Sequence, residues 1–313
     1  MLKLFSYIIL FIGSVSFAQS PVPAGASLEK IAGGFQFLEG PVWKDSVGLL
    51  FSDMGASTIF NYTPDGKIKI FLKPSDVSNG LTYDLHGRLI LTQTGLRRVA
   101  RLEPDGTQTL LASTYNGKKL NSPNDVAVKS DGSIFFTDPP FNIPSRQKQE
   151  LPFSGIFRIS GTTGALQLLD STLAFPNGIC FSPDEKKLYV NDSQARIIYV
   201  WDVANDSTIT NKKVFATMHA KGYADGMKID TKGNLYSAGP FGIWVFSPKG
   251  TVIDTIMVPG QTTNCNWGDA DRKTLYITAG TGLYRIRLTS STGINGQGYN
   301  PTKSFKLYGN NSK

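Results

Sequence analysis

Six side chains that carry oxygen recur along the 313-residue chain at a spacing that could bring them together in one site. Each opens one copy of a repeated segment, and consecutive copies begin 40, 45, 53, 48 and 39 positions apart. Carboxylate and amide oxygens are the ligands that hard divalent cations prefer. If the side chains converge, they predict a site for one divalent cation, with Ca²⁺ expected first and Mg²⁺, Mn²⁺ or Zn²⁺ as alternatives. The six opening residues are Glu39, Asn79, Asn124, Asn177, Asp225 and Asn264.

Four of these residues would form a ligand set with a definite chemistry. Glu39 and Asp225 would balance the charge of a divalent cation, Asn124 and Asn177 would add amide oxygens, and water would fill the open positions. Such a cation can polarise a carbonyl or phosphoryl oxygen, while an adjacent carboxylate handles a proton or attacks. The alternative is that Asn, Asp and Gly open the copies only because they form good turns, which leaves Glu39 unexplained.

Other catalytic chemistries lack their residues. The chain has only two histidines, His86 and His219, and no GxSxG motif, so a Ser-His-Asp triad is poorly supported. His86 lies in a hairpin turn and is expected to be exposed, and His219 is expected to have a structural or rim position. The absence of HExxH, CxxC and P-loop motifs leaves soft-metal, redox and nucleotide chemistry without support.

The repeated segment has the pattern of a β-hairpin. In the copy at residues 176–192, PNGICFSPDEKKLYVND, two short apolar runs flank a charged turn. Six copies of a strand-and-turn repeat of about 40–50 residues predict an all-β, six-bladed β-propeller over residues 39–290. If each copy begins the innermost strand of its blade, the six opening residues ring one mouth of the central channel.

The remaining strands and the closure of the ring follow from the same pattern. An open ring would expose a strand edge, so residues 28–31 are expected to pair with residues 282–288 of the last blade. Residues 138–153 contain prolines that exclude a regular element, and form either a substrate lid or a surface excursion. Third strands are predicted at 57–62, 97–102, 156–159, 197–201 and 243–246, and fourth strands at 68–71, 109–111 and 166–169.

The N-terminus has the pattern of a secretory signal peptide. Lys3 precedes a short apolar core at residues 4–15, and Ser16-Phe17-Ala18 fits a small-x-small cleavage site. This core is shorter than the roughly 20 residues that span a membrane. We therefore expect residues 1–18 to be removed and the mature protein to be exported to a periplasm or the cell exterior. Residues 19–38 are expected to form a linker and the closing strand, and residues 291–313 a flexible tail.

Charge and cysteine content restrict the partners. The formal net charge is +8, or +7 without Lys3, and the basic residues are scattered among hairpin turns, so nucleic-acid binding is not expected. The two cysteines, Cys180 and Cys265, lie in different copies. Buried free thiols are the favoured interpretation, although export would permit a disulfide. The sequence leaves the oligomeric state open.

Four short motifs carry a family resemblance. They are EGP at 39–41, SPND at 122–125, PNG at 176–178 and ADGM at 224–227. In this order and at blade spacing, they resemble the regucalcin/gluconolactonase (senescence marker protein) family of six-bladed propellers. KSDGSIFFTDPP and RKTLYITAGTGLYRI look like the bacterial gluconolactonase branch, and the resemblance covers nearly the whole mature chain.

The resemblance implies one catalytic divalent cation held by Glu39, Asn177 and Asp225, with Asn124 as a fourth ligand or substrate contact. It also implies that Asp225 is the catalytic carboxylate, which activates water or manages the leaving group's proton. Ser122 stands where the animal members carry an arginine that touches the sugar substrate, so their sugar-acid specificity does not carry over. Contacts with the substrate are expected from Asn124, Ser122, Asn79 and Asn264.

The function expected from the residues and the resemblance together is that of an exported, metal-dependent lactonase, which opens a sugar lactone to the hydroxy acid. One alternative is a phosphotriesterase like diisopropylfluorophosphatase, which shares the Glu/Asn/Asn/Asp ligand scheme. A second is a non-catalytic propeller that binds a ligand at the same mouth. The same metal and carboxylate serve a lactone or a phosphoester, so the residues do not separate the two enzymes. The presence of all four ligand-type residues disfavours the non-catalytic alternative.

Overall fold

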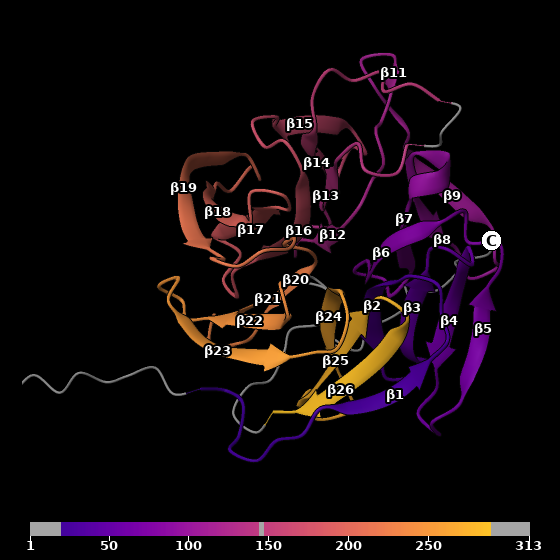
Figure 1. Cartoon of the computed structure of the whole chain (residues 1–313). Coiled ribbons are helices and arrows are strands. Elements are labelled where there is room, and N and C mark those ends of the chain that lie inside the picture. Colours follow the sequence, from indigo (N-terminus) through magenta and orange to yellow (C-terminus); the bar gives the residue numbers. More distant parts are fainter. Residues whose placement is uncertain (1–19, 144–146, 289–313) are drawn as a thin grey trace, which may run out of the picture.

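The computed structural model describes residues 20–143 and 147–288, which form six four-stranded antiparallel sheets arranged in a ring (Figure 1). Five sheets follow the chain in order, and the sixth combines the first strand with the last three. This is the six-bladed β-propeller that the repeats predict, so the fold prediction is confirmed. The predicted signal peptide, residues 1–18, and the predicted tail, residues 291–313, lie outside the described residues.

The blades are numbered along the chain, and the strands of each are given from the innermost outward. The first blade consists of β2 (Leu38–Lys44), β3 (Gly48–Asp53), β4 (Thr58–Tyr62) and β5 (Ile68–Leu72). The second blade consists of β6 (Ser78–Tyr83), β7 (Leu89–Gln93), β8 (Arg98–Leu102) and β9 (Gln108–Ala112). The third blade consists of β12 (Val126–Val128), β13 (Ile134–Asp138), β14 (Gly155–Ile159) and β15 (Leu166–Asp170). The fourth blade consists of β16 (Pro176–Phe181), β17 (Lys187–Asp192), β18 (Ile197–Val203) and β19 (Ile209–Thr217). The fifth blade consists of β20 (Met227–Ile229), β21 (Leu235–Gly239), β22 (Gly242–Phe246) and β23 (Val252–Met257). The sixth blade consists of β24 (Thr262–Gly268), β25 (Thr274–Ala279), β26 (Gly282–Arg287) and β1 (Glu29–Gly33). Between the second and third blades lie a short hairpin of β10 (Thr114–Tyr115) and β11 (Lys118–Lys119), and η1 (Thr94–Leu96) follows β7.

The third and fourth strands occur where the sequence places them, which confirms those assignments. Burial falls from the inside of a blade to its edge: β3 is wholly buried, whereas β5 has three exposed residues. A register shift interrupts the pairing of the third and fourth strands in every blade. Such irregularities twist the outer strand, which discourages pairing between the exposed edges of two molecules.

The apolar core is divided among the six interfaces between neighbouring blades, each of which holds one cluster of buried side chains. Between the third and fourth blades, for example, the rings of Phe135 and Phe181 meet edge to face with their centroids 4.9 Å apart. Cys180 and Cys265 belong to two different clusters and are unpaired, which confirms the interpretation as buried free thiols. Burial raises the pKa of both thiols.

The ring is closed by pairing the first strand with the last one. β1 runs antiparallel to β26 (Figure 1), with Glu29 opposite Arg285 and Gly33 opposite Gly282. The Arg285 guanidinium also forms two hydrogen bonds with the Glu29 carboxylate, at 2.8 and 3.0 Å. The predicted closure is confirmed, and it removes the strand edge that an open ring would leave.

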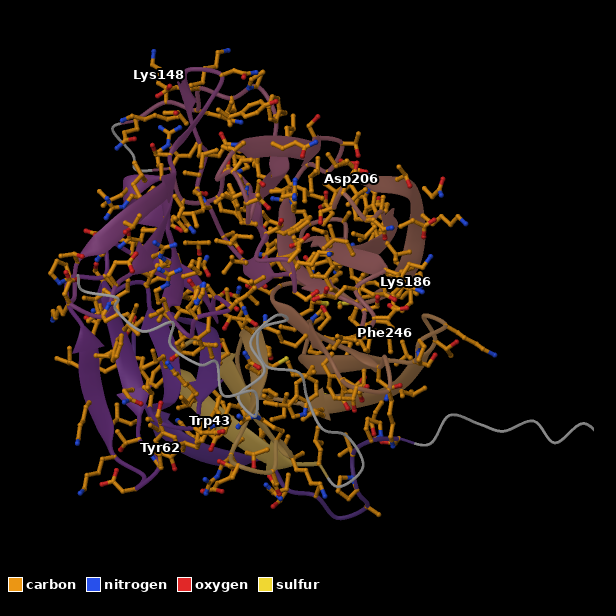
Figure 2. The ribbon with its side chains drawn as sticks, turned by 180° about the vertical axis from the view of Figure 1, so that it is seen from behind. Trp43, Tyr62, Lys148, Lys186, Asp206 and Phe246 are labelled. Atoms are coloured by element: carbon orange, nitrogen blue, oxygen red, sulfur yellow. The ribbon has the colours of Figure 1, made fainter. Side chains whose placement is uncertain are left out.

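Charged side chains lie mainly at the periphery of the molecule. Figure 2 shows Lys148, Lys186 and Asp206 at its outer edge, and all three are exposed. His86 and His219 are exposed as well. Among the described residues, no helix has the length and apolar character needed to cross a bilayer.

Candidate active site

A cavity of about 560 Å³ opens at one end of the ring. It is lined by the beginnings of innermost strands and by loops that follow second and fourth strands, which in antiparallel blades all lie at the same end. Five of the six opening residues contribute to the lining: Glu39, Asn79, Asn124, Asn177 and Asp225. The structure thus brings together side chains from five different blades.

The innermost strands place these residues at the cavity in two ways. Glu39, Asn79 and Asn177 are each the second residue of their strand, in β2, β6 and β16. Asn124 and Asp225 instead lie two residues before the shorter strands β12 and β20. The repeated sequence therefore sets equivalent positions even where the strand assignment begins later.

Two carboxyl groups from different blades meet in this set. Asp225 is hydrogen-bonded to Glu39, and the two side chains are only 7% and 3% exposed. Burial, together with the negative charge of Asp125, raises the pKa of Glu39 to about 7. Burial and the charge of Glu39 raise the pKa of Asp225 well above its ordinary value. A pair of like charges in such a place retains a proton until a cation takes the proton's role.

The amide side chains beside this pair have oxygens without partners. Asn177 hydrogen-bonds to Asp225, but its Oδ1 is buried and has no hydrogen-bonding partner among the described residues. Asn79 Oδ1 is in the same situation. An unsatisfied buried polar atom costs about 1–3 kcal/mol. These two oxygens therefore indicate a ligand in the cavity rather than a purely structural role.

The donor set fits a hard divalent cation. The described part of the chain contains no group of three or more His, Cys, Asp or Glu side chains that could hold a metal. The set at the cavity is of another kind, since it combines the carboxylates of Glu39 and Asp225 with amide oxygens. That combination suits Ca²⁺ or Mg²⁺ better than a soft metal. The raised pKa of Asp225 beside Glu39 and the unpartnered Asn177 Oδ1 both agree with this assignment.

Glycines that follow the opening residues allow the innermost strands to approach closely. At Gly226 a Cβ atom would lie 2.0 Å from Asn264 Cγ, and at Gly178 it would lie 2.4 Å from the main-chain oxygen of Asp225. Neither distance is possible for a real side chain. The NG and DG pairs in the repeats are thus required by packing between blades, in addition to their turn preference.

Polar side chains of the second strands hold the opening residues from the neighbouring blade, a feature that sequence reasoning missed. Each donates a hydrogen bond of 2.6–2.9 Å to the main-chain oxygen of the next opening residue. A hydroxyl or amide recurs at this position of every copy, and it is the second-last residue of five of the six second strands. That recurrence is a signal that could have revealed these residues. The donor–acceptor pairs are Ser52–Asn79, Thr92–Asn124, Thr137–Asn177 and Asn191–Asp225.

Two residues predicted to contact the substrate do not line the cavity. Ser122 is 1% exposed, and its Oγ donates to the main-chain oxygen of Pro139 at 2.5 Å. Asn264, also 1% exposed, donates from Nδ2 to Glu39 Oε2 at 3.2 Å. In this structure, Ser122 supports the loop that begins after β13, and Asn264 supports Glu39.

The predicted loop at residues 138–153 contributes to the cavity through its first part. Phe141 and Asn142 belong to the lining, and the Phe141 ring stacks on Phe175 at a centroid distance of 5.2 Å. Arg97 Nη1 holds the second part by donating to Gln147 Oε1 and to the main-chain oxygen of Lys148, at 3.1 and 3.2 Å. Residues 144–146 lie outside the described residues, and the lid function stays a prediction.

Comparison with known proteins gives a consistent result. Residues 37–281 match the family described as SMP-30/Gluconolactonase/LRE-like region. A gluconolactonase from Zymomonas mobilis is 35% identical over 289 residues, which cover 83% of this chain and 81% of the relative. The structure of a gluconolactonase from Xanthomonas campestris is 31% identical, with a TM-score of 0.80, and the match covers 84% of this chain and 90% of that one. The structure of regucalcin, a calcium-binding protein from Agrobacterium tumefaciens, shares the fold at 19% identity, with a TM-score of 0.75 and coverage of 88% and 98%.

Proposed function

This chain belongs to the SMP-30/gluconolactonase/LRE-like family, and from that premise we propose that it is a divalent-metal-dependent lactonase that opens a sugar lactone to the hydroxy acid. The observation that carries the proposal is the buried Glu39–Asp225 pair, which lies in a cavity beside amide oxygens that have no partner. A hydrolase needs an electrophile-binding cation and a carboxylate at one place, and these residues could supply both.

The residues that would hold the cation are Glu39, Asn177 and Asp225, with Asn124 as a fourth ligand or a substrate contact. When bound there, a divalent cation supplies Lewis acidity to the lactone carbonyl. Ca²⁺ is the ion we propose first, because all the donors are oxygens and because the family includes a calcium-binding regucalcin. Binding the cation would replace the proton that Glu39 and Asp225 share.

In the proposed reaction, Asp225 first accepts a proton and later returns it. Its carboxylate would accept a proton from the attacking water as the water oxygen forms a bond with the carbonyl carbon. The bond from that carbon to the ring oxygen then breaks, and Asp225 returns the proton to the departing oxygen. The sum is water plus lactone giving hydroxy acid, with no group left on the protein.

The lining of the cavity suits an uncharged polyhydroxy ring. Amide side chains at Asn79, Asn142 and Gln261 can donate to and accept from hydroxyl groups, and the rings of Phe37 and Tyr223 provide apolar surface. None of the lining residues is lysine, arginine or histidine, so the side chains of this wall offer no positive charge to a phosphate or carboxylate group of a substrate. We therefore propose a neutral sugar lactone as the substrate.

Proton release from glucono-1,5-lactone tests the proposal. The wild type should accelerate hydrolysis, a chelator should abolish the acceleration, and added Ca²⁺ should restore it. Asp225→Asn should reduce kcat by about 100-fold or more, because a general base contributes roughly that much. Equal rates for the wild type, the chelated protein and the variant would reject the proposal for this substrate.

A substrate panel separates the lactonase from the phosphotriesterase alternative. A preference for lactones over a fluorophosphate, measured as kcat/KM, is the expected result. The reverse preference would assign the same residues to phosphoester hydrolysis, and activity on neither class would favour the non-catalytic alternative.

Export of the protein is also part of the proposal. It is supported by the Lys3 charge, the apolar core at residues 4–15 and the small residues before Gln19. The intact mass of protein recovered outside the cytoplasm should correspond to a chain that begins at Gln19. Recovery of the uncleaved chain from the cytoplasm alone would contradict export.

A further inference from the structure

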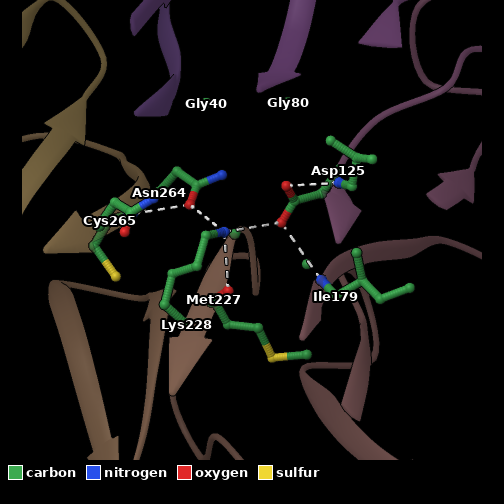
Figure 3. Close-up of polar contacts among 12 residues, drawn as sticks. Gly40, Gly80, Asp125, Ile179, Met227, Lys228, Asn264 and Cys265 are labelled. Carbon is green, nitrogen blue, oxygen red and sulfur yellow. Dashed lines mark hydrogen bonds and ion pairs between the residues drawn. The ribbon is translucent and has the colours of Figure 1, made fainter. Parts of the chain in front are cut away.

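Lys228 is a largely buried basic side chain whose ammonium group lies among polar atoms of several blades (Figure 3). Its Nζ donates to the main-chain oxygen of Met227 at 3.1 Å and to Asn264 Oδ1 at 3.5 Å, and it lies 3.6 Å from Asp125 Oδ2. These partners belong to the fifth, sixth and third blades. The third and sixth blades are opposite one another in a six-bladed ring, so the ammonium group bridges the centre. Only 12% of the side chain is exposed.

Asp125, the ion-pair partner of Lys228, acts on the proposed metal ligands through its charge. It is 2% exposed and directly follows Asn124. Its Oδ2 also accepts a hydrogen bond from the main-chain nitrogen of Ile179 at 3.4 Å. Through Lys228 and Asn264, a chain of polar contacts connects Asp125 to the proposed ligand Glu39. Asp125 therefore belongs to the same electrostatic unit, although it does not line the cavity.

Asn264 links Lys228 to the proposed ligand Glu39. Its Oδ1 accepts from Lys228 and from the main-chain nitrogen of Cys265, the latter at 2.9 Å, and its Nδ2 donates to Glu39 Oε2 at 3.2 Å. With its oxygen accepting and its nitrogen donating, the amide has one favoured orientation. Lys228 is consequently connected to the proposed ligand Glu39 through Asn264, although Lys228 is not among the residues that line the cavity.

The charges of this unit balance when one divalent cation is present. Glu39, Asp125 and Asp225 contribute three buried carboxyl groups, and Lys228 is the only basic partner of any of them among the ion pairs of the described residues. The fully ionised unit has a net charge of −2, since three negative charges face one positive charge. Buried charge without compensation is costly, so the unit favours the binding of a single divalent cation.

We propose that Lys228 is the internal counter-ion of the cation site, and that its fixed positive charge sets the affinity of this site and restricts it to one divalent ion. The inference rests on the cation site of the proposed function and does not depend on the lactonase reaction. Lys228 touches neither the cavity nor a proposed ligand, so it is a positioning residue rather than a catalytic one.

Calcium titrations by calorimetry on the purified protein test the proposal. The wild type should bind one Ca²⁺. Lys228→Met should bind Ca²⁺ about tenfold more tightly or take up a second ion, because a neighbouring positive charge has been removed. Asp125→Asn should bind about tenfold more weakly. The double variant, which restores the net charge, should return to within a few-fold of the wild type, and Lys228→Arg should match the wild type.

A lysine elsewhere provides the matched control. Lys129 has a side chain that is 13% exposed and pairs with Asp131 at 3.2 Å. Because Lys129 follows the end of β12 opposite to the one that Asn124 precedes, Lys129→Met removes an equally buried charge outside the proposed site. It should leave calcium binding unchanged. A double variant that binds as weakly as Asp125→Asn, or a Lys228→Met protein with unchanged or weaker binding, would overturn the counter-ion role while the proposed function stands. If Lys228→Met does not fold, an unchanged Ca²⁺ affinity in Asp125→Asn overturns the counter-ion role of Lys228. A wild type that binds no divalent cation overturns both this role and the proposed metal-dependent function.

Discussion

Asn191 Nδ2 donates a hydrogen bond of 2.6 Å to the main-chain oxygen of Asp225, across the interface between the fourth and fifth blades. The Oδ1 of the same side chain accepts from the main-chain nitrogen of Gly178 at 3.2 Å. Asn191 is fully buried, so one amide ties the segment that carries Asn177 to the segment that carries Asp225. The separation of these two proposed ligands is therefore fixed by a residue outside the cavity.

Replacing Asn191 should impair both stability and activity. Asn191→Ala leaves the Asp225 carbonyl without its donor, which should lower the free energy of unfolding by about 1–3 kcal/mol. The resulting displacement of Asp225 should lower kcat/KM by about tenfold or more, because small misplacements of catalytic groups are costly. Lactone hydrolysis and urea denaturation measure the two effects.

Ser52→Ala is the control for this prediction. Ser52 makes the same kind of bond, at 2.9 Å, to the main-chain oxygen of Asn79, which is not a proposed metal ligand. Its loss should reduce stability by a similar amount and leave kcat/KM within a few-fold of the wild type. Equal losses of activity in the two variants would mean that Asn191 serves folding only.

Calcium affinity should distinguish a proposed metal ligand from another residue that lines the cavity. Glu39→Gln removes a charge from the proposed site and should weaken calcium binding by about 100-fold or more. Asn79→Ala removes an amide of the same cavity that is not a proposed ligand, and should change the affinity by less than about threefold. Calorimetric titration compares the two variants, and similar losses in both would show that the ligands are misassigned.

Removal of the cation should destabilise the protein. Without it, the buried Glu39–Asp225 pair must share a proton or repel, whereas a bound ion stabilises the folded chain by mass action. At a Ca²⁺ concentration about 100 times Kd, the gain is about 2.7 kcal/mol. The melting temperature should fall on chelation and recover with Ca²⁺ in the wild type, and it should not respond in Glu39→Gln. A response of equal size in that variant would place the stabilising ion elsewhere.

Asp138, which is not among the residues that line the cavity, should make the stability of the protein depend on pH. This carboxyl group is fully buried, and burial raises its pKa to about 7, against the hydrogen bonds that it accepts from the main chain at Asn121 and Ser122. Between the ordinary carboxyl pKa and about 7, the folded state therefore binds more protons than the unfolded state. Stability should consequently fall as the pH rises through that window, by an amount on the order of a few kcal/mol.

Asp138→Asn tests whether Asp138 causes the predicted fall in stability with rising pH. The amide is neutral at every pH, and its oxygen can still accept from the main-chain nitrogen of Asn121, a bond of 2.7 Å in the native protein. The variant should lose stability less steeply than the wild type between pH 5 and pH 8, as measured by urea denaturation. A parallel decline in both proteins would assign the pH dependence to other groups.

The sequence predicts much of this protein because a blade is built from local patterns. Alternating apolar residues and polar turns predict the hairpins, and the repeat predicts their number and the pairing of residues 28–31 with the last blade. The opening residues follow from the same repeat, and five of the six do line one cavity. Asn264 was expected beside the substrate as an opening residue and Ser122 from the family resemblance, yet the side chains of both support neighbouring residues instead of lining the cavity.

By itself, the sequence determined which segments become strands, how many blades they form and which oxygen-bearing residues begin them, since each of these properties depends on residues close together in the chain. Only the tertiary structure decided that Lys228 faces Asp125 and that Asn191 holds Asp225. Those contacts join different blades, and they exist because closing the ring sets the distance and rotation of each blade relative to its neighbours. A repeat pattern carries no direct record of that geometry, because every copy would look the same at a different radius or twist.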